Sequence, residues 1–458
     1  MSLGGTRHQM SGQLELPLAG RGEAPRGKRS GEAPLAANGD GGLGTDHLLD
    51  EVVERRNLEM ALRRVEQNQG SPGVDGMVWQ DLRRLWEVQG ESLREQLLSG
   101  SYRPRAVLRR EIPKPGGGMR QLGIPTVLDR LIQQAILQVL QPRLDPTFSE
   151  HSYGFRPKRS AHDAVRAAQR YIQEGRVIVV DLDLEQFFDR VHHDVLMERL
   201  SRKIEDRRLL RLIRHYLEAG VLAGGVTKER HEGTPQGGPL SPLLANILLD
   251  EVDQELERSR HAFVRYADDC NVYVRSRRAV ELVMARLRRL YAGLRLQINE
   301  AKSAVARATE RKILGFSFWW GPGKTAKRRV APQALKRMKD RVRQLTRRTA
   351  GRSMAQIVET LRSYLLGWKE YFQLADTPGV FDDLDKWIRR RLRMVQLCQW
   401  KRGTTAFVEL RARGVSESVA ARACTHVRRW WLTSKHEALH IALPTRHFDR
   451  LGVPRLGR

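Results

Sequence analysis

Cysteine is scarce in this sequence, with three residues (Cys270, Cys398 and Cys424) in a chain of 458. They are too few and too widely spaced for a disulfide framework or a paired-cysteine zinc site. No stretch is apolar for long enough to cross a membrane, and the N-terminus has no apolar secretory segment. These absences exclude a disulfide-rich secreted protein and predict no membrane partner. They favour a reducing cytoplasmic setting.

Acidic residues are outnumbered by basic ones, and the formal net charge is +28. Residues 325–458 carry 30 Lys and Arg against 11 Asp and Glu, a net of +19. A single cluster such as Arg389–Arg391 is typical of a solvated helix surface. An excess sustained over the whole C-terminal region instead indicates a polyanionic partner, and we expect nucleic acid and association with the nucleoid.

Two adjacent carboxylates, Asp268 and Asp269, interrupt the β-rich run 261–275. The pattern predicts a hairpin with both at its tip. An ordinary Asp-Asp turn in solvent explains the tetrapeptide Tyr266-Ala-Asp-Asp equally well. The alternative is a divalent-cation site, of the kind a polymerase needs to hold two Mg²⁺ ions.

The apolar run that starts at Val177 ends in two further acidic residues, Asp181 and Asp183. Alternation along a strand places both on the same face. A two-metal site needs carboxylates from distant parts of a chain, and we predict Asp183 and Asp268 as that pair. We expect Asp181 to be an ion-pair partner of a nearby Arg.

Phe188, five residues after Asp183, is placed where an aromatic ring would exclude a 2′-hydroxyl from a nucleotide site. A core role for Phe187 and Phe188 is the simpler interpretation of the two residues alone. The mixed aromatic and basic segment Tyr153–Pro157 suits nucleotide stacking and phosphate contact, with a tight turn around a buried ring as the alternative.

Two loops also suggest nucleotide contacts. Lys114 and Arg120 flank a Gly-rich hairpin tip, where cations suit a triphosphate; a solvated loop is the alternative. Gly237 and Gly238 allow the backbone to approach a template base or primer closely. They are also compatible with a simple turn before a helix that has Ser241 as its cap and Pro242 as its first residue.

The chain predicts an α+β organisation with a helical C-terminal region. Residues 1–45 lack periodicity and are expected to be disordered. Helices and strands are expected by residue range as follows: helices over 46–69, 78–100, 125–141, 160–174, 192–202, 205–219, 243–258 and 278–293; strands over 105–113, 120–124, 176–184, 296–299 and 312–319; mostly helix from 331 onward.

The ordered motifs resemble those of bacterial group II intron reverse transcriptases with maturase activity. The residues that carry the resemblance are Gly73–Gly76, Ile112–Pro115, Arg120, Leu122–Pro125, His151–Pro157, Asp183, Phe188–Asp189, Gly233–Pro242, Tyr266–Asp269, Lys302 and Leu314–Phe316. The resemblance covers about residues 50–320 as fingers and palm and continues as a helical thumb. It implies a right-hand polymerase fold, with fingers and palm over 46–324, a thumb and maturase domain over 325–400, and a basic DNA-binding tail over 401–458.

The resemblance also implies residue roles. Asp183, Asp268 and Asp269 would be the catalytic carboxylates, with the Leu184 carbonyl as a further ligand to two Mg²⁺ ions. Lys302 would donate a proton to pyrophosphate. The roles implied in nucleotide binding are discrimination against ribonucleotides for Phe188, triphosphate binding for Lys114 and Arg120, and positioning of the template for Gln236 and Gly237.

The implied function is RNA-directed DNA synthesis together with splicing of the protein's own intron RNA. Intron RNA, target DNA with its primer, and deoxynucleotide triphosphates are the implied partners; the protein would act as a monomer or a homodimer. Family members often end in a zinc-binding endonuclease, and this sequence shows no such motif after Cys424. We therefore expect that it does not nick the second strand itself and takes its primer from elsewhere.

Three alternatives share these motifs. The main biological role could be RNA folding and splicing, or the protein could be a stand-alone domesticated or defence-associated reverse transcriptase. An RNA-templated RNA polymerase has similar paired carboxylates, but Phe188 argues against it.

Overall fold

The computed structural model describes residues 46–113, 118–223, 226–228, 230, 232–347, 351–425 and 429–457. The described residues divide into two compact units, one that ends at Ala326 and one that starts at Lys327. The predicted disordered segment 1–45 and the predicted triphosphate ligand Lys114 lie outside the described residues.

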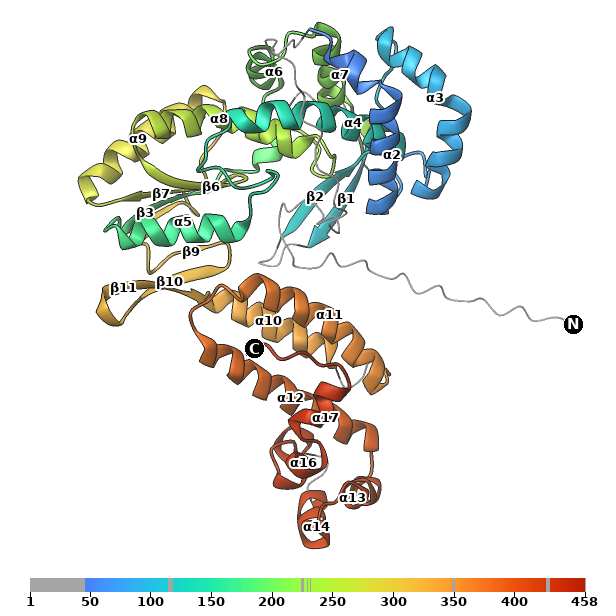
Figure 1. Cartoon of the computed structure of the whole chain (residues 1–458), viewed down its shortest axis with the longest axis vertical. Helices are drawn as coiled ribbons and strands as arrows, with labels where there is room; N and C mark the ends of the chain where they lie inside the picture. The colour runs from blue at the N-terminus through green and yellow to red at the C-terminus, as the bar shows by residue number, and fades with distance from the viewer. Residues whose placement is uncertain are drawn as a thin grey trace, which may run out of the picture. The chain divides into compact units, whose positions relative to one another are not determined.

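The first unit mixes helices with two four-stranded sheets (Figure 1). Its helices are α1 (Leu48–Val52), α2 (Arg55–Asn68), α3 (Leu82–Leu98), α4 (Val127–Leu144), α5 (Ala161–Gln173), α6 (His193–Ser201), α7 (Arg207–Glu218), α8 (Ser241–Arg258) and α9 (Arg277–Gly293). Short 3₁₀ turns are η1 (Trp79–Asp81), η2 (Asp145–Thr147), η3 (Phe187–Asp189) and η4 (Pro322–Lys324).

One sheet has the order β2-β1-β4-β5 and the other the order β6-β7-β3-β8. Their strands are β1 (Val107–Pro113), β2 (Met119–Ile124), β3 (Ile178–Leu182), β4 (Val221–Ala223), β5 (Val226–Lys228), β6 (Ala262–Tyr266), β7 (Asp269–Val274) and β8 (Ala304–Arg307). A three-stranded sheet has the order β11-β10-β9, made by β9 (Lys312–Ile313), β10 (Phe316–Gly321) and β11 (Thr325–Val330).

The β6-β7-β3-β8 sheet is covered by helices on both faces. Figure 1 shows α8 and α9 on one side and α5 on the other. Val180, Leu182 and Val272 belong to the buried core that α8 and α9 help to form. By alternation, Asp181 and Asn271, which pair across β3 and β7, face the opposite side. The sheet therefore has an apolar face that anchors it and a second face that carries polar side chains near one end.

The second unit is helical, as its sequence periodicity predicts. It comprises α10 (Pro332–Leu345), α11 (Met354–Phe372), α12 (Pro378–Trp400), α13 (Gly403–Ala412), α14 (Glu417–Thr425), α15 (Trp430–Thr433), α16 (Glu437–Ala442) and α17 (Thr445–Arg450). Local signals explain two of the starts. Ser353 forms a capping box with Gln356 at the start of α11, and Pro378 opens α12.

Several predicted elements need correction. Residues 312–319 form two strands, because Leu314 (φ 49°) and Gly315 (φ 84°) turn the chain between β9 and β10. The expected strand at 296–299 is only an isolated bridge between Ile298 and Leu184. Helix α8 begins at Ser241 with Leu240 in the cap position, so the predicted cap, Ser241, is instead the first helical residue.

Strands β4, β5, β8 and β11 are absent from the sequence-based predictions because they are short or strongly charged. Among the described residues, no helix combines the length and the apolar character that crossing a membrane requires.

Candidate active site

The two adjacent carboxylates lie at the tip of the β6–β7 hairpin, as predicted. Tyr266 pairs with Asp269, so Ala267 and Asp268 form a two-residue turn and Asp269 is the first residue of β7. Ala267 has a φ of 58°, in the left-handed region that two-residue hairpin turns use. Both carboxylate residues are half-buried, which contradicts a fully solvated turn.

The pairing of β3 with β7 brings Asp183 to the same place. This antiparallel register ends with Leu182 opposite Cys270, and Asp183 and Asp269 adjoin that last pair. Asp183, Asp268 and Asp269, which come from segments about 85 residues apart, therefore lie at the same end of the β6-β7-β3-β8 sheet.

Asp181, on the same face as Asp183, has a different partner. Its carboxylate accepts a hydrogen bond from Arg311 Nε at 2.9 Å and forms an ion pair with the same guanidinium. Burial raises the pKa of the Asp181 carboxyl, and the bond to Arg311 acts in the opposite direction. The expected ion-pair role of Asp181 is confirmed.

Lys302 reaches Asp183 from the turn that follows Asn299. Its ammonium Nζ lies 3.5 Å from Asp183 Oδ2, although 67% of the Lys302 side chain is exposed. The turn is fixed by its backbone, because Asn299 N–H donates to the Asp183 carbonyl at 2.8 Å and Lys302 N–H donates to the Asn299 carbonyl at 3.1 Å. Lys302 therefore places an exposed positive charge beside a predicted metal ligand.

The carboxylates at the sheet end have the chemistry that divalent cations require, because Mg²⁺ prefers hard oxygen ligands. Within the part of the chain that the structure describes, however, no three His, Cys, Asp or Glu side chains form a ready metal cage. The Asp183 carboxylate is instead paired with Lys302. The donor set fits a cation that is completed by oxygens from elsewhere, such as substrate phosphates or the carbonyl of Leu184.

Phe188 lies in η3, shortly after Asp183, and its ring is half-buried. It packs edge-on against Phe187 (ring centroids 5.1 Å apart) and Phe155 (6.4 Å). Phe187 is 2% exposed and is a core residue, as the simpler interpretation held. Phe188 is braced by the two rings while part of its surface stays accessible.

The segment Gly233–Pro242 packs against both η3 and strand β2. Thr234 N–H donates to the Phe188 carbonyl at 2.7 Å, and the Gln236 carbonyl accepts from Gly123 N–H at 3.0 Å. Gly237 has a φ of 139°, and a β-carbon there would approach the Gly123 carbonyl oxygen to 2.8 Å. The glycine thus serves a close approach to β2, an internal reason that the sequence-based argument missed.

The β1–β2 hairpin carries Arg120, one of the two predicted triphosphate ligands. Arg120 lies on β2 opposite Ile112, and Gln121 lies opposite Glu111. Since neighbouring strand residues point to opposite faces, Arg120 faces away from Gln121. Lys114 lies outside the described residues.

The aromatic and basic segment Tyr153–Pro157 has an internal role, so most of its predicted nucleotide contacts are wrong. Arg156 is 8% exposed, and its guanidinium binds Asp145 and the Ser152 carbonyl. Tyr153 is buried, and its N–H donates to the Arg265 carbonyl at 2.9 Å. The segment therefore supports the β6–β7 hairpin, and only Phe155 approaches the predicted nucleotide site.

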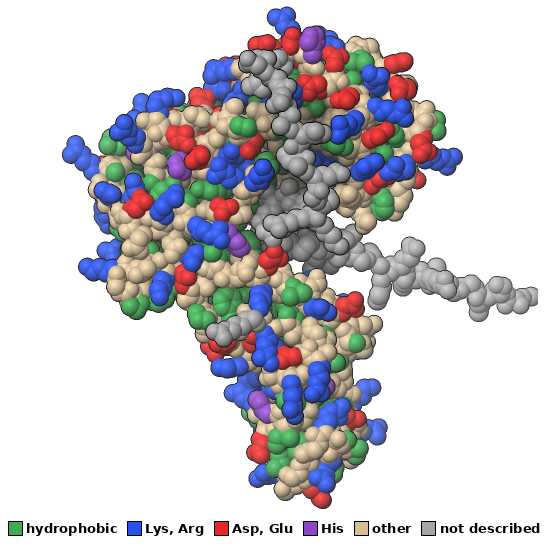
Figure 2. Space-filling model, in the orientation of Figure 1, with side chains coloured by type: hydrophobic (Ala, Val, Ile, Leu, Met, Phe, Trp, Pro, Cys, Tyr) green, Lys and Arg blue, Asp and Glu red, His purple; other side chains and the backbone are tan. Residues whose placement is uncertain are grey.

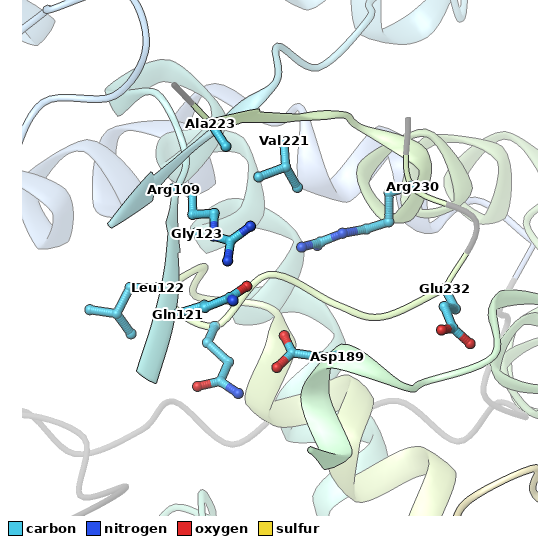
Figure 3. Close-up of a pocket in the computed structure, with 10 residues that line it drawn as sticks. Arg109, Gln121, Leu122, Gly123, Asp189, Val221, Ala223, Arg230 and Glu232 are labelled. Carbon is cyan, nitrogen blue, oxygen red and sulfur yellow. The ribbon is translucent and has the colours of Figure 1, made fainter. Parts of the chain in front are cut away.

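A cavity of about 430 Å³ lies beside Asp189 and Gln236 (Figure 3). Arg109 of β1 and Arg230 extend into it from different segments. Burial lowers the pKa of the Arg230 guanidinium, and its Nη1 is buried without a hydrogen-bond partner among the described residues. The sequence analysis did not single out either arginine, because each lies in a charged stretch without a motif.

Two family models match the chain. Residues 112–318 match "Reverse transcriptase (RNA-dependent DNA polymerase)", and residues 335–414 match "Group II intron, maturase-specific domain".

Curated relatives point the same way. The chain is similar to protein YkfC of Escherichia coli (34% identical over 321 residues, 61% of this chain and 83% of YkfC). It is also similar to the group II intron-encoded protein LtrA of Lactococcus lactis (40% identical over 172 residues, 37% of this chain but only 28% of LtrA).

Solved structures with partial similarity include a Cas6-RT-Cas1–Cas2 complex (TM-score 0.35, 28% identity, 54% of this chain and 42% of that chain). Telomerase from Candida albicans also matches (TM-score 0.39, 14% identity, 75% of this chain and 68% of that chain).

Proposed function

The chain belongs to the group II intron family of reverse transcriptases and maturases, and from this premise we propose that Asp183, Asp268 and Asp269 catalyse RNA-directed DNA synthesis. The observation that supports this proposal is that the β3–β7 pairing and the β6–β7 hairpin bring Asp183, Asp268 and Asp269 to one end of one sheet. Sequence-distant carboxylates brought together at a sheet end are what nucleotidyl transfer requires.

In this proposal the primer 3′-hydroxyl attacks the α-phosphate of a deoxynucleotide in line, and pyrophosphate leaves. Two bound Mg²⁺ ions would lower the pKa of the hydroxyl and stabilise the leaving group. Asp183 and Asp268 would hold them, aided by the Leu184 carbonyl, while Asp269 keeps the tip anionic. Lys302, whose Nζ lies 3.5 Å from Asp183 Oδ2, would give a proton to the leaving pyrophosphate.

The nucleotide would lie against Phe188, whose ring, packed against Phe155 and Phe187, would exclude a 2′-hydroxyl. Lys114 and Arg120 would bind the triphosphate, and Gln236 and Gly237 would position the template pair. The Gly233–Pro242 segment donates a hydrogen bond to Phe188 and accepts one from Gly123, and both bonds support its placement between η3 and β2.

The helical unit would be the thumb and maturase domain over 325–400, followed by a DNA-binding tail over 401–458. The net charge of +19 over residues 325–458, and the Lys and Arg side chains on the face of the helical unit that Figure 2 shows, suit a polyanion. We infer that it binds the intron RNA that the protein helps to splice, and target DNA during target-primed reverse transcription, which would place it at the nucleoid.

Two experiments test this function. Asp268→Ala should abolish primer extension on an RNA template while RNA binding stays close to wild type; full extension by that variant would refute the catalytic assignment. Splicing of a transcript with its native flanks, at low Mg²⁺, should depend on added protein. Intact primer extension without protein-dependent excision would mean a stand-alone reverse transcriptase.

A further inference from the structure

Arg265 of β6 is a fully buried cation two residues before the hairpin turn. Its side chain is 1% exposed and that of its partner, Asp253 of α8, is 0% exposed. Arg265 Nε donates to both Asp253 carboxylate oxygens, at 2.8 and 2.9 Å, and Nη2 donates to Oδ2 at 2.6 Å. The pair is therefore bidentate, and the geometry of the guanidinium is fixed by α8.

The remaining nitrogen of Arg265 reaches the turn itself. Nη1 donates to the Ala267 carbonyl at 2.9 Å and to Asn246 Oδ1 at 2.9 Å. The Ala267 carbonyl belongs to the peptide plane that joins Ala267 to Asp268. Fixing that oxygen fixes the orientation of the plane from which the Asp268 side chain extends.

Two further contacts hold the turn from the same helix. Asn246 Nδ2 donates to the Gly154 carbonyl at 3.0 Å. Gly154 packs so closely on the turn that a β-carbon there would approach Ala267 N to 2.3 Å. Helix α8 thus holds the turn by two routes. Asp253 and Asn246 of α8 bind Arg265, which in turn binds the Ala267 carbonyl. Asn246 also binds Gly154, which packs against the turn.

Stability alone does not explain this arrangement. Both charged groups of a fully buried ion pair lose their hydration, and well-packed apolar replacements are often equally stable. The arginine also binds the carbonyl of Ala267, whose φ of 58° is unusual for a residue other than glycine. A rigid fork that fixes one carbonyl is what such a turn requires.

We propose that Arg265, oriented by Asp253, is a positioning residue that holds Asp268 in its catalytic geometry. The proposal rests on the proposed function, because it takes Asp268 as a catalytic carboxylate. It links the catalytic turn to α8, the helix that begins at Ser241 immediately after the Gly233–Leu240 segment, so that both parts of the site share one support.

The first test is Arg265→Lys, which keeps the buried positive charge for Asp253 but cannot reach both Asp253 and the Ala267 carbonyl with a rigid fork. We expect kcat for single-nucleotide addition to fall roughly 10–100-fold, because displacement of a catalytic group by about 1 Å has effects of this size. The Mg²⁺ concentration for half-maximal rate should rise several-fold, while affinity for template-primer stays close to wild type. Wild-type kcat and wild-type Mg²⁺ dependence in folded Arg265→Lys would overturn the proposal.

The matched control is Arg389→Lys. Arg389 is 3% exposed and pairs with Asp385 at 3.0 Å in α12, in the other unit. It should show a comparable change in thermal stability without a change in Mg²⁺ dependence. An equal change in Mg²⁺ dependence in both variants would mean a general loss of stability and would also overturn the proposal.

If Arg265→Lys does not fold, the double variant Asp253→Leu/Arg265→Met removes both buried charges together. This double variant should fold, because no unpaired buried charge remains. Its Mg²⁺ concentration for half-maximal rate should still be higher than that of the wild type. Wild-type kinetics in this double variant would refute the positioning role. Asp268→Asn in the same assay separates the two claims: an active Asp268→Asn refutes the proposed function, whereas an inactive one with normal Arg265 variants refutes only the positioning role.

Discussion

Replacing Gly154 with alanine should distort the β6–β7 hairpin, although Gly154 is not one of the proposed catalytic residues. The added β-carbon would approach Ala267 N to 2.3 Å and the Tyr266 carbonyl carbon to 2.9 Å, and both are backbone atoms that no rotamer change can move. Overpacking of this kind costs about 1–3 kcal/mol, or a Tm loss of roughly 2–4 °C per kcal/mol for a domain of this size. Because the displaced atoms adjoin Asp268, polymerase activity should be reduced even at temperatures where the variant is fully folded.

The assay compares Gly154→Ala with Gly293→Ala by thermal unfolding and by primer extension at a temperature where both variants are folded. Gly293, the last residue of α9, has no heavy atom within 4 Å of its would-be β-carbon. Alanine there should be neutral or stabilising by about 0.4–1 kcal/mol. Wild-type stability and wild-type activity in Gly154→Ala would refute the close contact between this loop and the turn.

Three further predictions concern single side chains. Burial lowers the pKa of His193, whose Nε2 lies 2.8 Å from the Gly233 carbonyl. Just below pH 6.5 the unfolded chain therefore binds more protons than the folded one, so the free energy of unfolding should fall as pH drops below about 6.5. In denaturant titrations, His193→Gln should reduce this dependence on pH. Lys302→Met should slow nucleotide addition yet lower the Mg²⁺ requirement, because its ammonium no longer competes for Asp183, whereas an unchanged kcat would contradict the proton-donor role. Phe188→Val should weaken discrimination against ribonucleotides by roughly 10–200-fold in kcat/KM. Unchanged discrimination would show that another residue excludes the 2′-hydroxyl.

The elements around the candidate active site were predicted best from the sequence. The hairpin around Asp268, the strand leading to Asp183 and the helix after Gly233–Pro242 follow from alternation, turn residues and apolar periodicity, which act locally. Proximity of Asp183 to Asp269 could not be predicted from either segment alone, because it depends on the β3–β7 register.

Residues with internal roles were harder to predict. The sequence around Arg156 suggested a phosphate ligand, yet the Arg156 side chain is buried and donates to Asp145. Gly237 serves packing on Gly123. Arg265 carried a local signal, a charge inside the otherwise apolar strand β6, but its partner Asp253 lies on a helix whose position the sequence does not reveal.

Single-nucleotide addition by Asp183→Asn, Asp268→Asn and Asp181→Asn, measured by rapid quench on one primed RNA template, tests the central claim most directly. We predict that Asp183→Asn and Asp268→Asn lose on the order of 10³-fold or more in rate, because each removes a negative charge that is proposed to hold the cations. Asp181→Asn should retain most of the wild-type rate, because Asp181 pairs with Arg311. An active Asp183→Asn or Asp268→Asn enzyme, or an Asp181→Asn enzyme as inactive as the other two, would contradict this account of the site.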